Sequence, residues 1–197
     1  MSTKLIFRYS YIYEETLARL TGERFEYPDF EKSQKFVEEY QIFWNKINDK
    51  VFDFYKTLGL VLPEFWIGYA INERKELTPF SDPLTFFISD DFEKTTAIVI
   101  HELCHVFLIY GGNIKISNDL WEEVSKKYPN ENFNTIAHLQ VNLLAKAGVQ
   151  HIFGSEKTNE LLKPEREMNG LKEAWTIIDS KKEVLEEMDP IKAIHNL

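Results

Sequence analysis

Residues 90–111 constrain the fold more than any other stretch, because they read as one long buried helix with ionisable side chains inside it. His101, Glu102 and His105 follow the pattern H-E-x-x-H, and the residues around them are apolar on every side of a helix. A helix of this kind must be covered all round. We therefore expect the rest of the chain to pack around it.

The two ends of this helix are also marked in the sequence. Asp90 as N-cap, with Glu93 three residues later, predicts a capping box, and Gly111 and Gly112 predict the end of the helix. No proline or glycine interrupts the residues between these signals. The pattern therefore predicts one unbroken helix.

The H-E-x-x-H pattern predicts a metal site. Side chains four residues apart lie on the same helix face, so the imidazoles of His101 and His105 can converge on one ion. Glu102 projects beside that ion, where its carboxylate can take a proton from an activated water. Burying two imidazoles and a carboxylate without partners would cost several kcal/mol, about 2–7 for each uncompensated group. We therefore expect zinc, with His101 and His105 as ligands and Glu102 as general base.

A catalytic zinc site needs a third protein ligand, and three alternatives are open. His138 lies in a mostly apolar predicted helix, on a face of small and polar residues that would let another helix come close. Glu122 and Glu123 lie nearer in sequence, but they fall off the apolar face of their own predicted helix. His151 is the remaining candidate. Burial favours His138.

Composition limits the classes of protein that fit. The 197 residues, 44% of them hydrophobic, are long enough for one domain with a substantial core. Cys104 is the only cysteine, so an internal disulfide is excluded and zinc must bind histidine or carboxylate. A net charge of -9 argues against nucleic acid as a partner. No apolar run reaches the length of a membrane span and the start lacks a signal-peptide pattern, so we expect a cytoplasmic protein without a membrane partner.

Periodicity predicts an α+β chain, mainly helical, with a small antiparallel sheet. Strands are expected where β-branched and aromatic residues alternate, and helices where apolar residues recur every three or four positions. The predicted strands are residues 4–13, 64–71 and 84–89, with a helix from about residue 11 as the alternative for part of the first. The further predicted helices are residues 29–58, 114–128 and 132–149, followed by two or three amphipathic surface helices in residues 155–197.

The motif His101-Glu102-Leu103-Cys104-His105, with a strand before it, resembles that of the zincin metallopeptidases over residues 84–153. The metzincin extension is absent, because VFLIYGGNIK follows His105, and the spacing is similar to that of the gluzincins. The resemblance implies that residues 84–89 form an edge strand that holds a peptide antiparallel. It also implies that a residue four positions after the third ligand orients a zinc histidine; Asn142 stands there relative to His138, where gluzincins have a carboxylate.

Together these features predict a zinc-dependent metallopeptidase that acts on a peptide or protein substrate. Tyr110 and His151 are the candidates for a second group that stabilises the oxyanion. The alternative is a latent or catalytically silent zincin-fold protein that binds or regulates. That alternative comes from the acidic helical segment 155–197, which would be able to cover the cleft.

Overall fold

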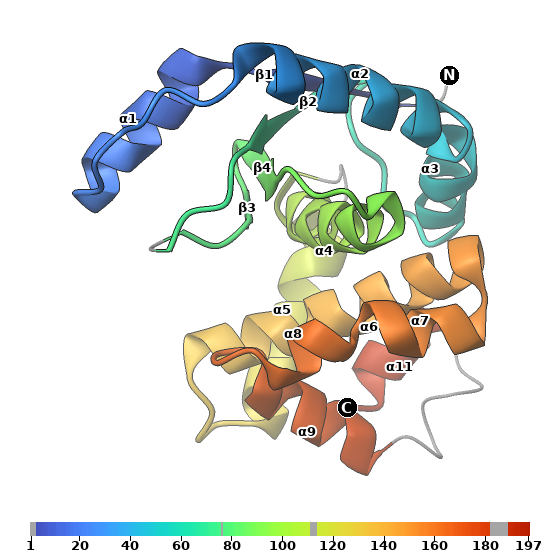
Figure 1. Cartoon of the computed structure of the whole chain (residues 1–197). Helices are drawn as coiled ribbons and strands as arrows, with labels where there is room; N and C mark the ends of the chain where they lie inside the picture. The colour runs from blue at the N-terminus through green and yellow to red at the C-terminus, as the bar shows by residue number, and fades with distance from the viewer. Residues whose placement is uncertain (1–2, 76, 111–113, 182–188) are drawn as a thin grey trace.

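The computed structural model describes residues 3–75, 77–110, 114–181 and 189–197. They form an α+β fold with a sheet-containing half and a helical half (Figure 1). The first half contains β1 (Lys4–Tyr9), α1 (Tyr11–Thr21), α2 (Phe30–Asn45), α3 (Asn48–Thr57), β2 (Phe65–Ile71), β3 (Phe80–Ser81), β4 (Leu84–Phe87) and α4 (Phe92–Tyr110). The second contains α5 (Ile114–Lys127), α6 (Phe133–Phe153), α7 (Ser155–Leu161), α8 (Lys163–Glu167), α9 (Lys172–Ser180) and α11 (Pro190–His195).

The sheet is mixed, with strand order β1-β2-β4-β3. β1 pairs with β2 and β2 with β4 in parallel, and only β3 runs antiparallel, against β4. The predicted antiparallel sheet is therefore wrong. The reason is topological, because α1, α2 and α3 lie between β1 and β2 and bring the chain back to start the second strand in the same direction. Parallel pairing of this kind leaves no local sequence signal.

The N-terminal elements differ from the prediction at two boundaries. The first strand ends at Tyr9, because the Ser10 side chain accepts a hydrogen bond from the Tyr13 backbone and caps α1. The predicted helix 29–58 is two helices. The break precedes Asn48, whose side-chain oxygen accepts from the Trp44 indole at 2.9 Å while its amide donates to the Thr3 carbonyl at 2.9 Å. Asn48 thus joins the second helix to the start of β1.

α4 is the buried helix expected from the sequence. Its cap is Asp91 and not Asp90, since the Asp91 carboxylate accepts from the Lys94 backbone at 3.0 Å. The expected capping box with Glu93 is therefore absent, while Gly111 and Gly112 lie outside the described residues. α2 and the sheet lie on one side of α4, and α6 lies on the other (Figure 1). This arrangement covers the helix on every side, as its apolar sequence requires.

The helical half shares its core with the sheet half. Asn132, where the sequence predicts the start of a helix, caps α6 by accepting from the Thr135 backbone at 2.9 Å. The segment 155–197 is not a set of surface helices, because Leu162, Trp175 and Ile194 are at most 1% exposed and belong to the one cluster of buried side chains. None of the described helices is both long and apolar enough to cross a membrane.

Candidate metal centre

A contact between three helices sets how α4 lies against α6. The hydroxyl of Tyr55, on α3, donates to the Leu144 carbonyl of α6 at 3.0 Å and lies 3.3 Å from the Cys104 sulfur of α4. Gly148 makes room for it, since a Cβ there would lie 2.0 Å from the hydroxyl. Gly148 therefore permits the close approach of these helices. This contact brings the histidines of α4 towards α6.

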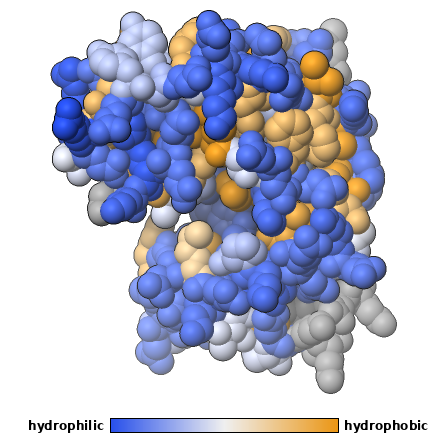
Figure 2. All heavy atoms as spheres, viewed as in Figure 1, coloured by the Kyte–Doolittle hydropathy of each residue, from blue (hydrophilic) through white to orange (hydrophobic). Residues whose placement is uncertain are grey.

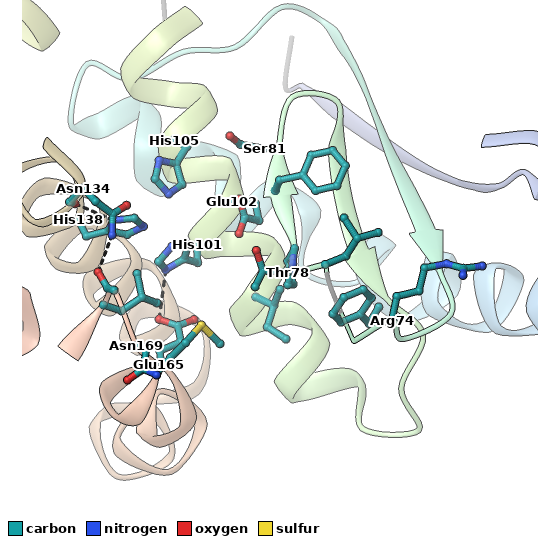
Figure 3. Close-up of a pocket in the computed structure, with 18 of the residues that line it drawn as sticks. Arg74, Thr78, Ser81, His101, Glu102, His105, Asn134, His138, Glu165 and Asn169 are labelled. Carbon is teal, nitrogen blue, oxygen red and sulfur yellow. Dashed lines mark hydrogen bonds and ion pairs between the residues drawn. The ribbon is translucent and has the colours of Figure 1, made fainter. Parts of the chain in front are cut away.

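Three histidines meet on the facing surfaces of α4 and α6 (Figure 3). His101, His105 and His138 each offer a ring nitrogen, and these three nitrogens lie within 4.8 Å of one another. The ring centroids are separated by 5.2 Å between His101 and His105 and by 5.0 Å between His105 and His138. The structure thus brings together the three residues that the sequence favoured as ligands. Glu102 is also buried and lies beside them (Figure 3).

Two of the histidines have one ring nitrogen occupied by a fixed acceptor. Nδ1 of His138 donates to the Asn134 carbonyl at 2.8 Å, because a carbonyl can only accept. Nδ1 of His101 donates to a carboxylate oxygen of Glu165 at 3.2 Å. In the neutral form of each ring, Nε2 is then left with its lone pair for another partner. Metal-binding histidines are held in this way by carbonyls and carboxylates.

The electrostatic surroundings of the histidines differ. Burial alone would lower the pKa of His101, but the Glu165 carboxylate outweighs it and the pKa rises to about 8. Burial and the neighbouring His101 and His138 lower the pKa of His105 to about 3. Burial likewise lowers the pKa of His138. At neutral pH, His105 therefore keeps the neutral ring that a metal ligand needs.

Burial also raises the pKa of Glu102 to about 7; the Glu165 carboxylate adds to the rise, and His101 opposes it. The carboxyl group forms no hydrogen bond to another side chain among the described residues, although only 7% of the residue is exposed. It faces the cavity that the histidines also line. Its position in the cavity leaves it accessible to a bound molecule.

Glu165, which the sequence analysis did not single out, is a member of the site. It lies on α8, is 8% exposed, and reaches His101 across 64 positions of the chain. Asn142, the expected orienting residue, does not have this role, because neither of its side-chain polar atoms has a hydrogen-bond partner among the described residues. The neighbouring residues are mostly charged or polar, so no local sequence pattern singles out Glu165.

The other candidate ligands lie elsewhere. Glu122 pairs with Lys126, and Glu123 pairs with Lys127 and His195. His151 is exposed and stacks on Phe54, with 4.7 Å between the ring centroids. None of these side chains lines the cavity that contains the histidine cluster.

Tyr110, one of the two candidates for an oxyanion donor, is also placed by the structure. Its hydroxyl donates to the Asp82 carboxylate at 2.5 Å, and it does not line the cavity. Asp82 is on the turn between β3 and β4. Neither Tyr110 nor His151 is therefore at the histidine cluster.

The cluster forms one end of a cavity of about 750 Å³. The cavity opens at the left of Figure 2, between the loop that leads to β3 and the turn after α8. The segment 155–197, which was expected to cover a cleft, forms a wall of this cavity through Glu165 and residues 168–171. β4 is not the edge strand, because β2 and β3 pair with it on its two sides. β3 lies at the edge and contributes Phe80 and Ser81 to the cavity.

The donor set fits a zinc ion. Three imidazole nitrogens with further space beside them match the ligand number and open position of catalytic zinc sites. Zn–N bonds of about 2.0–2.1 Å would draw the three nitrogens closer than they lie here, which small side-chain rotations can provide. His101, His105 and His138 would hold the ion, with Glu165 and the Asn134 carbonyl orienting two of the rings.

Comparisons of the chain with protein-family models, with curated proteins and with solved structures find no match.

Proposed function

We propose that this protein is a zinc-dependent metallopeptidase with a zincin-like arrangement of its site. The observation that carries the proposal is the meeting of His101, His105 and His138 beside the buried Glu102 at the end of an open cavity. Zinc, when bound, supplies a Lewis acid that polarises the scissile carbonyl and lowers the pKa of water. The other functions needed for hydrolysis come from the chain.

Glu102 acts as the proton carrier in this proposal. Its carboxylate removes a proton from the attacking water as the water oxygen bonds to the carbonyl carbon. The same proton then passes to the amide nitrogen as the carbon–nitrogen bond breaks. Burial supports this role, since a carboxylate screened from bulk water keeps the proton for the leaving amine.

Substrate binding follows from the edge of the sheet. An extended peptide can add to an exposed strand through backbone hydrogen bonds. β3 is the antiparallel edge strand, and both of its residues, Phe80 and Ser81, line the cavity that Glu102 faces. A peptide paired with β3 would therefore run past the histidine cluster. The resemblance to zincins predicts that residues 84–89 pair with the peptide. In our proposal β3 is the strand that does so.

The test is a cleavage assay with a quenched peptide library on the purified full chain, before and after zinc removal by a chelator. We expect cleavage that stops on chelation and returns with zinc. Glu102→Gln should keep its zinc but lose about 10²–10⁴-fold in kcat/KM, the usual contribution of a general acid–base. Absence of cleavage by the zinc-loaded wild type would contradict the proposal and favour a catalytically silent binding protein.

A further inference from the structure

β3, the edge strand proposed to bind the substrate, is too short to fix its own position. It has two residues and pairs with β4 at two positions. Its other side is the edge of the sheet, and both of its residues line the cavity. Two strands with so short a ladder are at best marginally stable by themselves. The contacts that hold β3 must therefore come from outside the sheet.

The loop that leads into β3 is held by Glu14 of α1. One carboxylate oxygen of Glu14 accepts from the Arg74 guanidinium at 3.0 Å, and the other accepts from the Asn72 amide at 3.1 Å. Glu14 is 1% exposed and the Arg74 side chain is 8% exposed, so bulk water screens this pair little. Arg74 also binds Glu23, which follows α1, at 3.3 Å. The chain is therefore fixed to α1 shortly before β3 begins.

A second contact from α1 holds the turn after β3. The Thr85 hydroxyl of β4 donates to the Pro83 carbonyl at 2.7 Å, so its single proton is in use. The Tyr13 hydroxyl, which lies 2.8 Å from the Thr85 oxygen, is therefore the donor between them. The Tyr13 ring also packs against the Tyr69 ring of β2, with 4.7 Å between the centroids. Through Thr85, α1 thus reaches the turn between β3 and β4.

The two anchoring residues are adjacent in the sequence. Tyr13 and Glu14 lie in the first turn of α1, which the Ser10 side chain caps. None of the described residues of α1 lines the cavity, and Figure 1 shows the helix well apart from α6. A helix outside the cavity therefore holds the chain on both sides of the strand that borders it.

We propose that α1 is a brace for the edge strand, with Tyr13, Glu14 and Arg74 as positioning residues that fix β3 for substrate binding. This role rests on the proposed function, because β3 is the strand proposed to bind the peptide. A strand that is already fixed loses less conformational entropy when a peptide pairs with it. The brace therefore acts on substrate affinity and leaves the chemical step at Glu102 unchanged.

The test uses the double variant Tyr13→Phe with Glu14→Gln. It keeps the size of both side chains and removes the hydroxyl of one and the charge of the other. Amide hydrogen exchange of the zinc-loaded chain, read by mass spectrometry, should become about tenfold faster in residues 77–87 and stay unchanged in α4 and α6. KM for a cleaved peptide should rise about tenfold, the order of one charge-assisted hydrogen bond, with kcat unchanged.

Tyr11→Phe with Glu15→Gln is the matched control, because it makes the same two chemical changes on the same helix. Tyr11 is 43% exposed, and Glu15 pairs with Arg19 on the surface. Exchange and KM should both equal those of the wild type. Unchanged exchange in residues 77–87 of the first variant, or faster exchange throughout α4 and α6 as well, would overturn the brace.

Hydrogen exchange needs no catalysis, so the brace and the proposed function can fail separately. Faster exchange confined to residues 77–87, in a chain that cleaves no peptide, would support the brace and contradict the peptidase. Faster exchange there with an unchanged KM, in a chain that does cleave, would overturn the role of the brace in substrate binding.

Discussion

Two buried clusters of ionisable groups lie on opposite walls of the cavity, and they are built differently. In the first, Arg74 is paired with both Glu14 and Glu23, so each carboxylate has a cation. In the second, His101, His105 and His138 lie beside Glu102 and Glu165, and the only ion pair described there joins His101 to Glu165. In the first cluster Arg74 thus meets both carboxylates without a ligand, although its Nε has no hydrogen-bond partner among the described residues.

The second cluster has an excess of lone pairs. It contains three ring nitrogens and two carboxyl groups. Among the described residues, no lysine or arginine is paired with any of them. A divalent cation would bind the three ring nitrogens together. The comparison indicates that Arg74 does in the first cluster what a metal ion is proposed to do in the second.

The largest change in stability is expected at the cluster formed by Arg74, Glu14 and Glu23. Arg74→Met keeps the aliphatic stem but leaves Glu14, which is 1% exposed, as a buried charge without its cation. Losing one partner of a buried pair costs about 3–5 kcal/mol. Denaturant unfolding should show this loss, with zinc content per chain unchanged. Arg19→Met is the matched control, because the Arg19–Glu15 pair lies on the surface and contributes little to stability. An equal loss of stability in both variants would show that the buried cluster does not hold the loop before β3.

Zinc should stabilise the second cluster as Arg74 stabilises the first. At free zinc 100 times its Kd, the folded chain gains about 2.7 kcal/mol, which corresponds to a rise in melting temperature of roughly 5–10 °C. The rise should be seen by differential scanning fluorimetry. His138→Ala should lose most of it, because one of the three nitrogens is gone. A full rise in this variant would exclude His138 as a ligand.

Replacing Glu165 should have a smaller effect on zinc binding at the same site. Glu165→Gln keeps the shape but replaces the charged acceptor of the His101 Nδ1 hydrogen bond with a neutral one. Residues that orient a metal ligand contribute about 10–100-fold to metal affinity. Competition with a chelator of known affinity would measure this. Glu167→Gln, an exposed residue on the same helix, is the control and should bind zinc as the wild type does.

No change in zinc affinity is expected from substitutions at the candidate ligands that lie outside the cavity. Glu123 pairs with Lys127 and His195, and His151 stacks on Phe54. Glu123→Gln and His151→Ala should each bind zinc within about twofold of the wild type, as surface changes away from a site usually do. Loss of zinc in either would show that the ligand set is wrong.

The sequence predicted the parts of the site that depend on helical spacing. His101, Glu102 and His105 are related by a single turn, and His138 was favoured because its own helix is mostly apolar. Glu165 was beyond reach, because its contact depends on how α8 returns to α4 after 64 positions of chain. Asn142 was chosen by spacing from His138 alone, and its side chain forms no hydrogen bond among the described residues.

The fold was predictable in its elements but not in their pairing. The buried helix, the strand at residues 64–71 and the Asn132 cap follow from local residue patterns. The parallel register of β1 and β2 depends on the path of three intervening helices. β3, with two residues, is too short to show an alternating pattern. Of these two features, β3 is the one that lines the cavity.

The most direct test of the account is the zinc content of the purified chain, measured by elemental analysis after zinc is added and excess is removed. The wild type and Glu123→Ala should each hold about one zinc per chain, and His101→Ala and His138→Ala should hold almost none. A wild type without bound metal, or His138→Ala with a full equivalent, would contradict the central claim that these three histidines form one metal site.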